Sequence, residues 1–161
     1  MEDLNQLTQL LERMIEVHTR LLDLAKEKRG VLVAGDIQDI QSLLFRESSC
    51  TDEIQKLEQR RKQLVQEYME QRGMTGHSFT LEEVVKLPAE PSIKARLDLI
   101  AKQLRYLVQE ISQVNESNQQ LIQTSLSYIQ YAMSLYVPKE QEIGYGQKRK
   151  KQYASLLDAK I

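Results

Sequence analysis

The feature that most constrains this chain is a helical pattern from Ile93 to Tyr136 that neither Pro nor Gly interrupts. Residues at alternating steps of four and three are almost all apolar, with polar exceptions at Asn118 and Ser125. A period near 3.5 over this length predicts a helix with a coiled-coil-like seam, which needs partner helices. At roughly 1.5 Å per residue it would be about 65 Å long. The seam positions are Ile93, Leu97, Ile100, Leu104, Leu107, Ile111, Val114, Asn118, Leu121, Ser125, Tyr128, Ala132 and Leu135.

A second apolar row lies beside this seam in the last third of the helix. It consists of Ile122, Leu126, Ile129, Met133 and Tyr136. Two adjacent rows make an apolar face that is wider than one coiled-coil seam requires. Either two other helices of the chain pack against this face, or the second row stays uncovered and receives a partner.

Composition favours an extended helical protein. The chain has 161 residues, of which 41% are hydrophobic and 28% charged, and runs of β-branched residues are absent. Its net charge of −1 gives no general signal for nucleic acid or anionic membrane. The charge is uneven, because six basic and three acidic residues follow from Lys139 onward. Because the whole chain is nearly neutral, we expect no nucleic-acid partner, although the run Lys148–Lys151 could contact phosphates.

Cysteine usage and hydropathy indicate the compartment. Cys50 is the single cysteine, so no intramolecular disulfide can form. The first residues include Glu2 and Asp3 and show no apolar secretory core. No stretch approaches the roughly 20 apolar residues of a membrane span. The sequence predicts a cytoplasmic protein without membrane insertion.

Two further long helices precede the one described above. The first is predicted over Asp3–Val33 and the second over Ile37–Gln71, each with an alternating three–four seam. Between them, Gly35 suits a left-handed cap and Asp36 the next N-cap, which predicts a tight antiparallel turn. Two charged residues, Glu47 and Arg61, interrupt the seam of the second helix, so each must be paired or reach solvent.

The connector and the tail complete the predicted organisation. Thr80 and Glu83 fit a capping box, which predicts a short helix over Leu81–Leu87 that Pro88 and Pro91 separate from the long one. The fold class is therefore all-α: three long helices in an elongated antiparallel bundle or coiled coil, a short connector helix and a flexible C-terminal tail. We predict a helical domain over residues 1–138 and a flexible basic tail over 139–161.

Catalytic chemistry has little support in the sequence. His18 and His77 fall in different elements, and no nucleophile–base spacing, phosphate loop or metal-ligand cluster is present. His18 lies on a seam, where a packed histidine is the expected state. The pair Glu82–Glu83 is explained by helix capping. We predict a protein that is not an enzyme and has no catalytic residues, no cofactor and no metal site.

Several segments together suggest a family. The first is Leu21-Leu22-Asp23-Leu24-Ala25-Lys26-Glu27-Lys28, followed by Gly35-Asp36-Ile37 and then by Leu43-Leu44 with Glu47. The second is Asn118-Gln119-Gln120-Leu121-Ile122, followed by Ser125-Leu126 and Tyr128. The third is the tail pair Tyr145-Gly146. In their order and spacing these segments resemble FlgN-type flagellar export chaperones. One departure is that Gln147-Lys148-Arg149-Lys150 follows the tail pair where some members have a second glycine.

The resemblance implies a cytoplasmic chaperone that binds hook–filament junction proteins, prevents their premature assembly and delivers them to the type III export gate. In this family the end of the last helix and the following tail engage the cargo, and a tail tyrosine docks on the cytoplasmic domain of the gate. That implies gate contacts at Tyr145 and Gly146. The implied cargo-binding residues are Asn118, Leu121, Ile122, Ser125, Leu126, Ile129, Met133 and Tyr136.

A different class of protein fits the same pattern. A structural coiled-coil protein would use its seams, including the second row, to form a homo-oligomer without cargo. Concentration-dependent self-association in the absence of cargo would favour that alternative.

Overall fold

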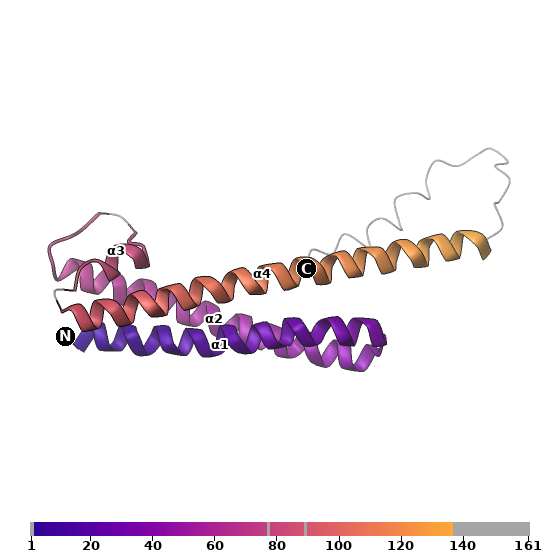
Figure 1. The fold of residues 1–161 in the computed structure, drawn as a ribbon, viewed down its shortest axis with the longest axis horizontal. Helices are drawn as coiled ribbons and strands as arrows, with labels where there is room; N and C mark the ends of the chain where they lie inside the picture. The colour runs from indigo at the N-terminus through magenta and orange to yellow at the C-terminus, as the bar shows by residue number, and fades with distance from the viewer. Residues whose placement is uncertain (1, 77, 89, 137–161) are drawn as a thin grey trace. The chain divides into compact units, whose positions relative to one another are not determined.

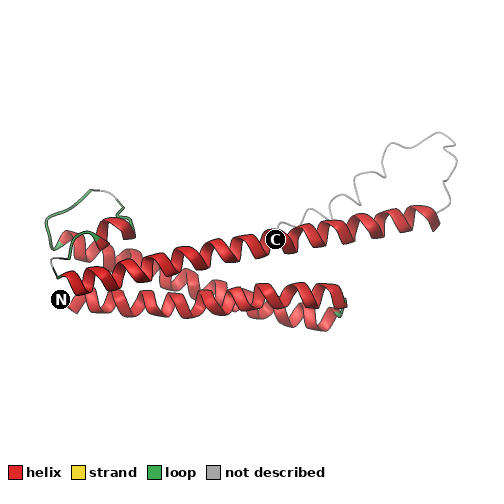
Figure 2. Ribbon diagram, viewed as in Figure 1, coloured by secondary structure: helices red, strands yellow, loops and turns green. Residues whose placement is uncertain are grey.

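The protein is all-α in the part of the chain that the structure describes. The computed structural model describes residues 2–76, 78–88 and 90–136, and no strand occurs there. Its helices are α1 (Glu2–Ala34), α2 (Ile37–Glu70), α3 (Leu81–Val85) and α4 (Pro91–Tyr136), as Figures 1 and 2 show. Every predicted helix exists, and each begins and ends within two residues of its predicted bounds.

The turn between α1 and α2 follows from two residues. Gly35 has φ +72°, and its N–H donates to the Val31 carbonyl at 3.0 Å. Asp36 then caps α2, because its carboxylate accepts hydrogen bonds from the backbone N–H groups of Gln38 at 2.8 Å and Asp39 at 3.1 Å. These contacts confirm the predicted left-handed cap and N-cap.

Replacing Gly35 with Val should lower the free energy of unfolding by about 1–2 kcal/mol, because a β-branched side chain is disfavoured at positive φ. No heavy atom lies within 4 Å of the position where the new Cβ would be, so backbone strain alone sets the cost. Gly30→Ala is the matched control: Gly30 lies within α1 and is equally uncrowded, so this change should stabilise by roughly 0.5–1 kcal/mol. Urea denaturation of both variants is the measurement, and equal stability would contradict the turn.

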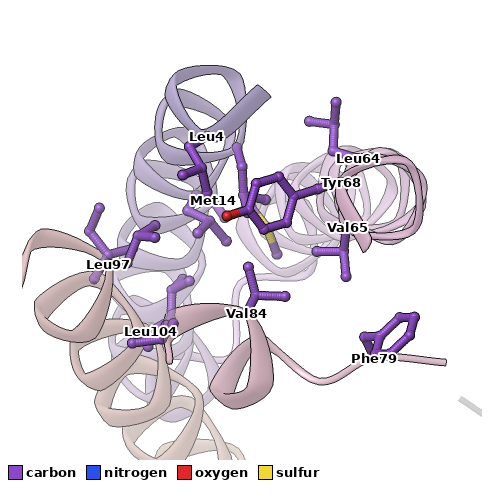
Figure 3. Packing of buried hydrophobic residues seen from close by; sticks show 14 of the residues in the cluster. Leu4, Met14, Leu64, Val65, Tyr68, Phe79, Val84, Leu97 and Leu104 are labelled. Atoms are coloured by element: carbon purple, nitrogen blue, oxygen red, sulfur yellow. The ribbon is translucent and has the colours of Figure 1, made fainter. Parts of the chain in front are cut away.

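The connector contributes to the core as well as linking α2 to α4. Thr80 accepts a hydrogen bond from the Glu83 N–H at 3.3 Å, and the Glu83 carboxylate accepts one from the Thr80 N–H at 2.6 Å. This confirms the predicted capping box. Phe79, Val84 and Val85 are buried in the largest core cluster, which also includes residues of α1, α2 and α4 (Figure 3). The predicted seams did not include these three residues.

Helices α1 and α2 pack side by side and antiparallel (Figure 1). Arg13 of α1 pairs with Glu53 of α2 at 2.6 Å, and Lys28 further along α1 pairs with Glu47, which comes earlier in α2, at 3.0 Å. The side chains of Lys28 and Glu47 are mostly buried. Glu47, a charge that interrupts the α2 seam, therefore has its partner on the facing helix.

The second seam charge is paired within its own helix. Arg61 donates to both carboxylate oxygens of Glu58, from Nε at 2.7 Å and from a terminal nitrogen at 2.6 Å. This bidentate contact lowers the pKa of Glu58 and raises that of Arg61. Because the folded-state pKa of Glu58 is depressed, the contact stabilises the fold at pH values above the ordinary carboxyl pKa. This stabilisation is lost as the pH falls through the folded-state pKa of Glu58.

Helix α4 runs parallel to α1. Arg96 pairs with Glu12 near the start of both helices, and Ser117 accepts from Arg29 much further along both. Between these contacts, Leu22 of α1 is buried with Leu107 and Ile111 of α4, next to the partly buried Ile15. α1 therefore has two apolar neighbours, α2 and α4.

The chain divides into two compact units, Met1–Ser125 and Leu126–Ile161. Helix α4 continues from the first into the second, in which residues 126–136 are described. The contacts above all belong to the first unit, which we call the helical unit. The finer predictions, a coiled-coil bundle and a domain boundary at residue 138, stay predictions; the predicted tail lies outside the described residues.

Candidate functional site

The seam of α4 changes from buried to exposed along the helix. Leu97, Leu107 and Ile111 are buried, and Asn118 is only 3% exposed. Farther along the same row Ser125 is exposed, as are Tyr128 and Leu135. One apolar repeat therefore serves as core in its first part and as surface in its last turns.

Asn118 is the last fully buried residue of this seam. Its amide nitrogen Nδ2 donates to the backbone carbonyl of Ala25 in α1 at 2.7 Å, which ties α4 to α1. Its other amide atom, Oδ1, is buried and has no hydrogen-bond partner among the described residues. A pocket of about 250 Å³ lies beside it, lined also by Lys28, Glu47 and Ile122. Asn118 therefore holds the register of α4 on α1, as a buried seam asparagine does in coiled coils.

The other predicted cargo-binding residues differ in exposure. Leu121 and Ile122 are half-buried, and Ser125 is exposed. The remaining four lie on the last turns of α4 and are between 41% and 86% exposed: Leu126, Ile129, Met133 and Tyr136. Spacings of three and four residues place these four on one face of the helix, over about 15 Å of its length. We call them the α4 face.

The candidate list taken from the sequence omits two exposed aromatic residues of these turns, Tyr128 and Tyr131. Tyr131 is 64% exposed, and it follows Tyr128 by three residues and precedes Leu135 by four. These three therefore form a second exposed stripe on the same turns. The three–four spacing that identifies the α4 face in the sequence is also present for these three residues, but Tyr128 and Leu135 belong to the predicted seam.

The end of α4 also lacks charge. No Asp, Glu, Lys or Arg occurs between Glu116 and Lys139. The polar side chains among residues 126–136 are Ser127, Gln130 and Ser134 besides the tyrosine hydroxyls. A helix that is apolar on several sides is usually covered, so these turns have the composition of a buried helix and the exposure of a surface one.

The described part of the chain gives no sign of a reactive centre. No group of three or more His, Cys, Asp or Glu side chains suited to a metal ion occurs within it. His18 is buried, and its Nδ1 donates to the Met14 carbonyl at 2.7 Å, which agrees with the predicted packed histidine. The resolved pKa shifts, such as the lowering for Glu53 by hydrogen bonds from Arg13 and Arg20, belong to ion pairs of α1 and α2.

Tyr145, Gly146, the run Lys148–Lys151 and His77 lie outside the described residues. None of the described helices is long and apolar enough to cross a membrane.

Comparison with known proteins shows the family to which the chain belongs. A protein of Bacillus subtilis (strain 168), the uncharacterized protein YvyG, is 26% identical over 135 residues, which cover 84% of this chain and 81% of YvyG. No solved structure matches the chain. The family model described as FlgN protein matches residues 1–152, nearly the whole sequence. The chain therefore belongs to the FlgN family of flagellar export chaperones.

Proposed function

We propose that this chaperone binds hook–filament junction proteins through the α4 face and keeps them from assembling before export. The observation that carries the proposal is the exposure of Leu126, Ile129, Met133 and Tyr136 in a chain of a chaperone family. Exposed apolar surface of this kind commonly marks a protein interaction site. A helical segment of the cargo is the expected ligand, because side chains three and four residues apart fit the face of an amphipathic helix.

The chemistry of the α4 face also defines how cargo binds. Because charged side chains are absent between Glu116 and Lys139, burial of apolar area and hydrogen bonds to Ser and Gln supply the affinity. Such binding needs no nucleotide, metal or cofactor, and it changes little with salt because no exposed ion pair is involved. The proposed mechanism is equilibrium capture of an aggregation-prone helix, followed by release at the export gate.

Co-purification tests the proposed function directly. The tagged full chain is recovered from a lysate of motile cells, and bound proteins are identified by mass spectrometry. Recovery of hook–filament junction proteins, retained after a high-salt wash, is the expected result. Loss of these proteins in the salt wash, or their absence, would contradict the proposal.

The alternative of self-association has one observation in its favour. Tyr128, Ala132 and Leu135 continue the seam period of α4, and a second copy of this helix is one partner that such a seam fits. Sedimentation velocity over a range of protein concentrations distinguishes the two. A monomer that forms a defined complex with cargo supports the chaperone function, whereas oligomers that exclude cargo support the structural one.

The tail is proposed to act separately from the α4 face, as the contact with the cytoplasmic domain of the export gate. We expect Tyr145→Ala to weaken gate binding by about tenfold or more, because a buried aromatic anchor supplies much of the affinity of a polar segment. Cargo binding and thermal stability should stay unchanged. Tyr153→Ala, a tyrosine in the same tail, is the matched control. Calorimetric titration of each variant with gate domain and with cargo is the measurement; equal losses for both partners would contradict the separation.

A further inference from the structure

A second candidate surface lies at the other end of α4, where α3 packs near its first turns. A pocket of about 490 Å³ opens between these two helices in the helical unit. Its apolar part is formed by Val85 of α3 and by Pro91, Ala95 and Ala101 of α4. Small alanine side chains leave room there for an apolar group larger than themselves.

The rim of this pocket carries more positive than negative charge. Two of its four cations are already paired: Arg105 with Glu82 at 2.6 Å and Lys102 with Asp98 at 2.8 Å. The other two, Lys86 and Lys94, have no ion-pair partner among the described residues. Four cations against two carboxylates give the rim a net charge of +2, while the whole chain has a net charge of −1.

We propose that this pocket is a docking site for an acidic peptide segment of a partner protein. An apolar side chain of the segment would lie on Val85, Ala95 and Ala101, and neighbouring carboxylates would meet Lys86 and Lys94. Charge complementarity of this kind gives specificity and accelerates encounter more than it adds affinity. The inference is independent of the α4 face, which carries no charge.

Two observations favour a peptide over other anionic ligands. The rim carboxylates of Glu82 and Asp98 would repel a continuous row of phosphates, whereas they can accept hydrogen bonds from peptide N–H groups. The apolar interior also offers nothing to a phosphate. The protein's own segment 139–161 is excluded by like charge, since its six basic and three acidic residues leave it at +3.

The probe for this site is a short fluorescein-labelled peptide with a central Leu-Phe pair flanked by glutamates. Fluorescence anisotropy should show that it binds the full wild-type chain, and that the double variant Lys86→Glu/Lys94→Glu binds it about tenfold or more weakly, since like charges then face each other. Binding to the wild type should also weaken as salt is added. Lys86 and Lys94 are exposed, so the melting temperature should stay unchanged.

Matched controls make the outcome decisive. Lys26→Glu/Lys56→Glu changes the net charge equally at exposed lysines of α1 and α2 outside the pocket, and it should keep the affinity within about twofold. Peptides with Gln for Glu, or with Ser-Ser for Leu-Phe, should bind more weakly. No binding to the wild type, or equal loss in both double variants, would overturn the proposal. Tighter, pocket-dependent binding of a single-stranded oligonucleotide or of vesicles containing phosphatidylglycerol would overturn the assignment to a peptide.

Discussion

Replacing Leu126, Ile129 and Met133 with serine is expected to abolish binding of hook–filament junction proteins and to leave the helical unit folded. All three side chains are exposed, so the fold loses little by their removal. A bound partner would lose the apolar area that they bury, and at about 1.5–3 kcal/mol for each fully buried side chain the affinity should fall a hundredfold or more. Calorimetric titration with purified cargo is the measurement, and circular dichroism checks the helix content.

A matched control exists on the same helix. Leu99, Tyr106 and Val108 of α4 are 66%, 58% and 51% exposed, similar to the three residues of the α4 face, but they belong to the helical unit. Serine at these three positions should leave cargo binding unchanged. Equal loss of binding in both triple variants would contradict a localised site. Unfolding of the first variant would show that the α4 face is core. Ile122 is left in place because it is half-buried and lines the pocket beside Asn118.

Leu97→Ala is expected to cause a large loss of stability. Leu97 is 0% exposed and lies in the core cluster that joins α4 to α1, α2 and the connector. Truncating a fully buried leucine costs about 2–5 kcal/mol, because transfer free energy is lost and a cavity remains. Chemical denaturation monitored by circular dichroism measures the change.

Leu99→Ala is the control for this change, because the same substitution is made two residues away on the exposed side of the helix. Because Leu99 is 66% exposed, replacing it with Ala should change the free energy of unfolding by no more than about 0.5 kcal/mol. Similar losses for the two variants would mean that the first part of α4 does not pack as described. A loss confined to Leu97 would confirm that this part of the seam is core.

The features that the sequence predicted correctly are local ones. The helix bounds agree because periodicity, prolines and capping residues act over a few residues: Gly35 takes positive φ and Thr80 forms a capping box with Glu83. The pairing of Glu47 was predicted as a necessity, since a charge in a seam needs a partner, but its partner was not named. That partner is Lys28, which only the packing of α2 on α1 could identify.

The features that the sequence did not predict depend on contacts between distant segments. Phe79, Val84 and Val85 become core because the connector lies on three long helices, and nothing in their local pattern distinguishes them from surface residues of a loop and a short helix. Likewise, Ile15 and Leu22 of α1 pack against α4, and the sequence did not predict this because the direction from which a third helix approaches is a tertiary property.

The periodicity of residues 93–136 predicts that α4 is long and carries a continuous apolar seam. Three-dimensional packing determines which part of that seam is core, since Asn118 is buried and Tyr128 is exposed in the same row. The physical reason is that the period of a seam depends on the helix alone, whereas its burial depends on what lies opposite. Helix α1 has 33 residues and α4 has 46. Helix α1 is therefore too short to supply a facing residue for every turn of α4.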